Sequence, residues 1–140
     1  MQTPAPRALA LRTTRVTYSG SAEHISTVRA DLRPILHDCP MADDVVLSTS
    51  ELAANAALHS HSRLPGGTFT VHAKLSPGDY VWVAVEDDGG PWTPRPSDPA
   101  RAHGLDIVRA LASDCGLDGD HHARTVWARF DWPDSQEAGR

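Results

Sequence analysis

A chain of 140 residues suits one compact domain and leaves little room for a second. Its formal net charge of −5 does not favour non-specific nucleic-acid binding, and no apolar run is long enough to cross a bilayer. The N-terminus lacks the basic start and the apolar stretch of a signal peptide, and Cys39 and Cys115 fit no metal or redox spacing. These features predict a cytoplasmic protein with reduced thiols that binds neither nucleic acid nor membranes.

The domain itself is expected over residues 11–132, with disordered segments at 1–10 and 133–140. Hydrophobic periodicity and turn residues divide it into helices and strands. Pro34 should kink the first helix, because proline lacks a donor and clashes with the preceding turn. The predicted elements in chain order are a strand 11–19, a helix that Ser21 caps, a helix 42–60, strands 68–76 and 79–87, a helix 103–113, a turn 116–119 and a strand 124–132.

The order of these elements predicts the fold class. Two strands joined by Pro77-Gly78 give the clearest hairpin signal in the sequence. Helices then alternate with strands in a way that allows one sheet with its helices on one side. We expect an α/β two-layer sandwich, in which a mixed, mostly antiparallel sheet carries about three helices on one face.

Asp87 is the first candidate binding residue. Three valines alternate along the strand before it and should face the helices, because side chains of a strand alternate with period two. Asp87 has the same parity, and a buried carboxylate needs a hydrogen-bond donor. Gly89 and Gly90 follow, where a ligand could approach the backbone closely. A buried acid beside glycines suggests recognition of a donor group on a ligand, such as the amino group of adenine.

A second group of candidates lies on the helices. Glu51 and Asn55 are one turn apart and project from the same helix face. The amide oxygen of Asn55 can ligate Mg²⁺, and the carboxylate of Glu51 can orient or deprotonate an attacking hydroxyl or water. Gly104-Leu105 is expected to open the helix 103–113, where free N–H groups favour phosphate. Each feature is common by chance, so the interpretation depends on their combination and order.

Four segments resemble motifs of the GHKL ATPases, the superfamily of gyrase, heat-shock chaperones and histidine kinases. The resemblance covers nearly the whole chain, about residues 12–132. The short length and short lid resemble the bacterial anti-sigma-factor branch, the serine-protein-kinase-like regulators. The segments are Ser50–His59 (SELAANAALH) for the N-box, Val85–Trp92 (VEDDGGPW) for the first glycine box, His103–Val108 (HGLDIV) for the second, and Thr125–Trp127 (TVW) for the closing strand.

This resemblance implies a Bergerat-type ATP-binding fold with assigned roles. Glu51 would be the catalytic base, Asn55 the Mg²⁺ ligand and Asp87 the adenine contact. It also implies a protein that binds a sigma factor, phosphorylates a serine of an anti-anti-sigma partner and can form a homodimer. The other nucleotide-binding residues that the resemblance implies are Gly89, Gly104, Leu105 and Thr125.

Two departures from the family motifs leave alternatives open. Ala102 stands where the second glycine box usually has its first glycine, and Ala123-Arg124 stands where a Gly-Lys-like pair usually precedes Thr125. The leading hypothesis is an ATP-dependent serine/threonine-protein kinase that acts as an anti-sigma factor. One alternative is a nucleotide-sensing module that sequesters a regulatory partner without catalysis. The other is a pure interaction protein whose nucleotide pocket has decayed.

Overall fold

The computed structural model describes residues 10–59, 64–89, 99–119 and 122–133. The predicted disordered segments at the two ends therefore lie almost entirely outside the described residues. No helix in the described part of the chain is long and apolar enough to cross a bilayer. Both cysteines are free, as predicted.

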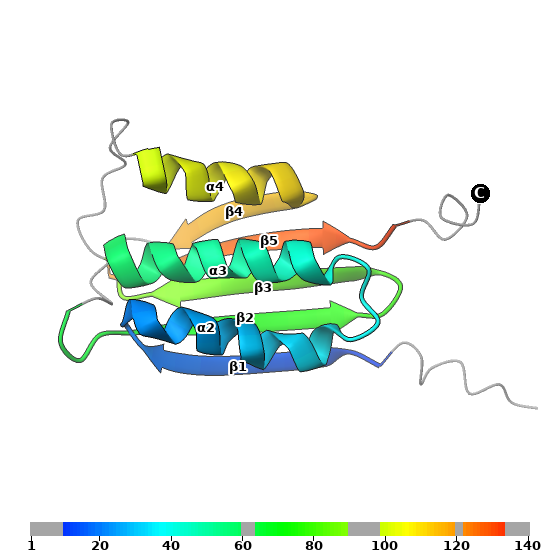
Figure 1. Cartoon of the computed structure of the whole chain (residues 1–140), viewed down its shortest axis with the longest axis horizontal. Helices are drawn as coiled ribbons and strands as arrows, with labels where there is room; N and C mark the ends of the chain where they lie inside the picture. The colour runs from blue at the N-terminus through cyan, green and yellow to red at the C-terminus, as the bar shows by residue number, and fades with distance from the viewer. Residues whose placement is uncertain (1–9, 60–63, 90–98, 120–121, 134–140) are drawn as a thin grey trace, which may run out of the picture.

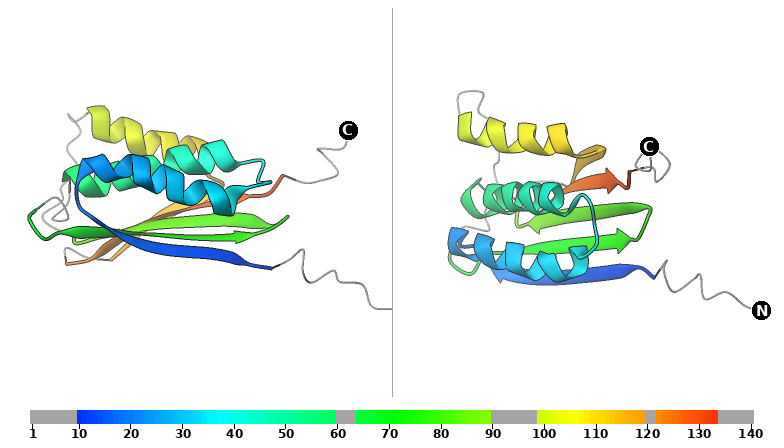
Figure 2. Two further views of the ribbon diagram at one scale, coloured as in Figure 1. Left: turned by 60° about the horizontal axis from the view of Figure 1, so that its bottom comes forward. Right: turned by 45° about the vertical axis from the view of Figure 1, so that its right-hand side comes forward.

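The fold is a two-layer sandwich, in which one sheet carries helices on one face (Figures 1 and 2). Its elements are β1 (Arg12–Ser19), η1 (Ala22–His24), α2 (Ile25–Leu32), η2 (Arg33–Leu36), α3 (Ala42–His59), β2 (Thr68–Ser76), β3 (Tyr80–Asp87), α4 (Pro99–Leu111), β4 (Asp114–Gly119) and β5 (Arg124–Asp131). The strand order is β1-β2-β3-β5-β4, and every neighbouring pair of described strands is antiparallel. The predicted fold class is confirmed.

Local sequence explains how the first helices begin and end. The hydroxyl of Ser21 accepts a hydrogen bond from the backbone N–H of Glu23 and caps η1. The predicted kinked helix is instead a series of three short helices. Pro34 lies in the 3₁₀ segment η2, because it cannot donate the hydrogen bond that would continue α2. Asp43 and Asp44 lie in the first turn of α3, where carboxylates interact favourably with the helix dipole.

Two boundaries in the second half of the chain differ from the sequence prediction. α4 begins at Pro99, because proline is tolerated at the first helical position, where a backbone N–H has no partner within the helix. Residues 116–119, predicted as a turn, belong to β4. A Cβ on Gly116 would lie 2.7 Å from the indole ring of Trp127. Glycine is therefore required there by a close approach within the sheet, not by a turn.

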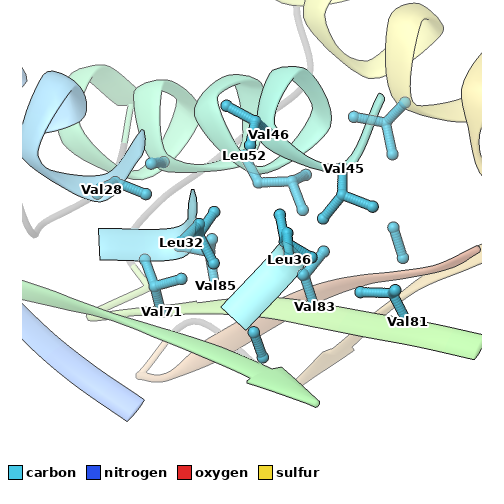
Figure 3. Packing of buried hydrophobic residues seen from close by; sticks show 14 of the residues in the cluster. Val28, Leu32, Leu36, Val45, Val46, Leu52, Val71, Val81, Val83 and Val85 are labelled. Carbon is cyan, nitrogen blue, oxygen red and sulfur yellow. The ribbon is translucent and has the colours of Figure 1, made fainter. Parts of the chain in front are cut away.

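The hydrophobic core fills the space between the sheet and the helices (Figure 3). Val81, Val83 and Val85 of β3 are buried, which confirms the face predicted from their alternation. They pack in one cluster with side chains of α2, η2 and α3, so the helix layer is fixed to the central strands. The helical members of this cluster shown in Figure 3 are Val28, Leu32, Leu36, Val45, Val46 and Leu52.

The opposite face of the sheet carries polar and aromatic side chains. The guanidinium of Arg129 lies 4.3 Å from the ring centroid of Tyr80, and the ammonium of Lys74 lies 5.2 Å from that of Trp82. Cationic groups over aromatic rings stabilise such an exposed face. Along each strand, the parity of a residue therefore decides whether its side chain faces the helices or this outer face.

Two leucines of α3 provide a matched test of this packing. Leu52 is 2% exposed and lies in the core, whereas Leu47 of the same helix is 43% exposed. Leu52→Ala should lower the free energy of unfolding by about 2–5 kcal/mol, because it leaves a cavity. Leu47→Ala should change it by less than about 0.5 kcal/mol. Urea unfolding measures both, and equal effects would contradict the described orientation of α3.

Candidate nucleotide site

A cavity of about 190 Å³ lies where α3 and α4 meet β4 and β5. Figure 1 shows α4 beside α3, on the part of the sheet that β4 and β5 form. Most lining side chains are apolar, and the polar ones come from three different elements. Such a combination is typical of small-molecule sites, where apolar walls hold a ring and a few polar groups fix its orientation. The described lining residues are Asn55, Leu105, Val108, Arg109, Cys115, Gly116, Leu117, Arg124 and Val126.

Asn55, the predicted Mg²⁺ ligand, lies at this cavity. It is 8% exposed and lines the cavity from α3. Its Oδ1 atom is buried and accepts no hydrogen bond from the part of the chain that the structure describes. A buried oxygen in this state costs free energy unless a ligand satisfies it. An amide oxygen is also a good ligand for Mg²⁺, so Asn55 fits a bound magnesium ion or one of its waters.

Asp87 is buried at the end of β3, as predicted, and both of its carboxylate oxygens accept hydrogen bonds from the protein itself. Oδ1 accepts from the backbone N–H of Gly89 at 2.7 Å, and Gly89 has a φ of 69° that favours glycine. Oδ2 accepts from Nη2 of Arg124 at 3.1 Å. Burial raises the pKa of Asp87, whereas the Gly89 N–H and the Arg124 guanidinium act in the opposite direction.

Arg124 is the site residue that the sequence prediction missed. It is buried, lines the cavity and lies directly opposite Asp87 in the pairing of β3 with β5. A signal for it exists in the sequence. Arg124 has the same parity as Val126, Ala128 and Phe130, and these apolar residues mark the inward face of the strand.

Thr125 lies on the opposite face of the sheet and is not brought together with the other predicted residues. Its side chain lines a shallow groove on the outer face with Trp82 and Glu86. Thr125 therefore does not line this cavity, and its role in nucleotide binding stays a prediction. The reason is the alternation along β5, where an inward Arg124 requires an outward Thr125.

The remaining predicted residues are partly brought together. Leu105 lines the cavity, and Gly89 contacts Asp87 through its backbone. Glu51 is half-buried one turn before Asn55 on α3 and is not among the described lining residues. Gly104 lies inside α4, so the prediction that it opens this helix is wrong. Residues 90–92 of the first glycine box lie outside the described residues.

Comparison with known proteins identifies the family. Residues 18–130 match the sequence model of the histidine kinase-like ATPase domain. The chain belongs to this family. The match includes every described residue that lines the cavity. Among curated protein sequences, none matches the chain significantly.

Solved structures agree with this histidine kinase-like ATPase fold. The chain superposes on a structure titled the RsbU and RsbW domains of Rv1364c from Mycobacterium tuberculosis, with a TM-score of 0.68 and 23% identity. That match covers 86% of this chain but 32% of the solved chain, so this chain spans about a third of its length. A blue-light-activated histidine kinase domain from Erythrobacter litoralis matches with a TM-score of 0.51 and 18% identity, covering 84% of this chain and 67% of that chain. At these identities, the likeness shows the fold alone.

The raised pKa of Asp87 predicts a pH dependence of stability. The native protein binds this proton more tightly than the unfolded chain, in which the pKa is near 3.8. The stability that Asp87 contributes is thus fully present below that value and is lost as the pH rises through the folded pKa. Relative to Asp87→Asn, the wild type should become less stable over this window. Urea unfolding of both proteins between about pH 3.5 and 7 measures the difference, and a pH-independent difference would contradict the shift.

Proposed function

We propose that this histidine kinase-like ATPase domain binds Mg·ATP in the cavity and acts as an anti-sigma factor with serine/threonine-protein kinase activity toward an anti-anti-sigma partner. The observation that carries the nucleotide part is the buried Oδ1 of Asn55. Asn55 lines a largely apolar cavity, and its Oδ1 accepts no hydrogen bond from the described residues. A magnesium–nucleotide complex fits this site, because its Mg²⁺ can be ligated by the amide oxygen and its aromatic base can pack against the apolar walls.

Different residues of the cavity would contact the base and the magnesium ion of the nucleotide. Val108 and Val126 offer apolar contacts to a base from α4 and β5. Asn55 would hold Mg²⁺, which when bound neutralises charge on the phosphates. The guanidinium of Arg124 adds a fixed positive charge next to the same cavity. Its partner Asp87 keeps that charge in place.

Glu51 is proposed as the base of phosphoryl transfer. It lies one turn before Asn55 on α3, and a carboxylate in that position can accept the proton of an attacking serine hydroxyl. The choice of partners is supported by the resemblance of the motifs to the anti-sigma-factor branch. It is also supported by the similarity in fold to the solved structure of the RsbU and RsbW domains of Rv1364c.

One observation favours a second candidate, a nucleotide-sensing module that sequesters its partner without catalysis. Glu51 is half-buried and is not among the residues that line the cavity in the described part of the chain. A carboxylate outside the cavity would leave nucleotide binding intact and contribute no proton transfer. The two candidates differ only in what happens after Mg·ATP has bound.

Two variants of α3 test the nucleotide site. Asn55→Ala should weaken binding of Mg·ATP by about 10- to 100-fold, because it removes the proposed magnesium ligand. Ser48→Ala is the matched control, since Ser48 is also buried on α3 with an Oγ that has no hydrogen-bond partner among the described residues, but it does not line the cavity. Calorimetry measures both affinities.

Saturating Mg·ATP should also raise the Tm of the wild type. No rise would support the decayed-pocket alternative.

Catalysis is tested with Glu51→Gln. Transfer of label from γ-labelled ATP to a serine of the cognate anti-anti-sigma partner should fall by about 10²- to 10⁴-fold, because the general base is lost. Binding of Mg·ATP should persist, since the amide keeps the shape of the side chain. If the wild type binds Mg·ATP but transfers no label, and the variant still sequesters its partner, the non-catalytic module is the correct function.

A further inference from the structure

The two cysteines of the chain lie in different environments. Cys39 is buried in the hydrophobic core, and its thiol donates to Sδ of Met41 at 3.9 Å. Burial raises the pKa of the Cys39 thiol, so less of it is present as the reactive thiolate. Cys115 of β4 is only partly buried and lines the cavity. A reagent that enters the cavity therefore meets Cys115 and not Cys39.

The position of Cys115 in the sheet explains its access to the cavity. Cys115 pairs with the fully buried Ala128 of β5, and residues directly opposite each other share one face, so Cys115 lies on the helix side of the sheet. β4 is an edge strand of this sheet. Leu117 lies on the same face of β4 and lines the same cavity, yet it is 51% exposed. The wall of the cavity that β4 forms is therefore open to solvent.

A second feature marks this cavity as a ligand site. Asn55 is 8% exposed, lines the cavity from α3, and has an Oδ1 that accepts no hydrogen bond from the residues that the structure describes. Such an atom is costly unless a ligand satisfies it. The cavity volume of about 190 Å³ exceeds the volume of about 150 Å³ in which an engineered protein cavity binds benzene. A group attached to Cys115 thus competes for space with the base of a nucleotide.

From this arrangement we propose that Cys115 is a thiol-modification site, through which a small disulfide excludes Mg·ATP from the cavity. The proposal rests on the proposed nucleotide site and adds its regulation. In the exchange, the Cys115 thiolate attacks one sulfur of the disulfide, a bond forms between Sγ and that sulfur, and the S–S bond of the reagent breaks. Cys115 is oxidised and the reagent is reduced, and its second half leaves as a thiolate that takes up a proton. Excess free thiol reverses the exchange.

The test uses the full chain and bis(2-hydroxyethyl) disulfide, a small neutral probe. Mass spectrometry should locate the hydroxyethylthio group of the probe on Cys115 and not on Cys39. Calorimetry should then show that the affinity for Mg·ATP falls by more than about tenfold, because the attached group fills part of the cavity. Dithiothreitol should restore the affinity of the same sample.

Protection by the nucleotide is an independent measurement, which does not require the modified protein to stay folded. At about 100 times its Kd, Mg·ATP should slow the modification of Cys115 by about 100-fold, because only the ligand-free protein reacts. Mass spectrometry at a fixed excess of the disulfide gives the rates with and without nucleotide.

Two variants are matched controls. Cys115→Ala should take up no probe, and its affinity for Mg·ATP should be the same before and after treatment. Cys39→Ala should take up one group and lose affinity as the wild type does.

Three kinds of result would overturn the proposal. Modification of Cys39 as fast as Cys115 would show that the probe reacts with the unfolded chain and not through the cavity. Modification of Cys115 without loss of Mg·ATP affinity, or without protection by the nucleotide, would overturn the regulation and leave the proposed nucleotide site standing. An untreated wild type that binds no Mg·ATP would overturn the proposed function as well.

Discussion

The ion pair of Asp87 and Arg124, buried between two neighbouring strands, is the interaction on which the candidate site depends. A carboxylate at the inward end of β3 is costly in an apolar core unless a donor compensates its charge. The antiparallel pairing of β3 with β5 places the compensating guanidinium directly opposite. Of the two residues, Arg124 lines the cavity, whereas Asp87 is not among the described lining residues.

The fold brings Arg124 of this pair and Asn55 to the same cavity. α3 packs on the central strands through a continuous apolar face, which brings Asn55 to the cavity from the helix layer. α4 and the edge strand β4 close the same space from the other side. Gly116 of β4 leaves room for the ring of its cross-strand partner Trp127, which does not line the cavity. The cavity is thus built from elements far apart in the sequence, and its polar lining residues come from α3, α4 and β5.

Much of the fold could be predicted because its signals are local. The valines of β3, the Pro77-Gly78 turn and the apolar stripes of the helices lie within short windows of sequence. Predictions from short windows of sequence were wrong where contacts between distant parts of the chain determine the local structure. Gly116 was interpreted as a turn residue, although the neighbouring indole ring is what requires glycine. Pro99 begins α4, although the sequence predicted that this helix starts at residue 103.

By itself, the sequence determined the sandwich, the inward direction of Asp87 and the pairing of Glu51 with Asn55 on one helix. Residues 18–130 of the sequence also match the histidine kinase-like ATPase domain family. Only the tertiary structure decided which side chain forms an ion pair with Asp87, because the register of β3 with β5 places residue 124 opposite residue 87. The same register turned Thr125 to the outer face and Arg124 to the cavity. Side-chain alternation is a local property, whereas the partner of a buried charge is fixed only when two distant strands pair.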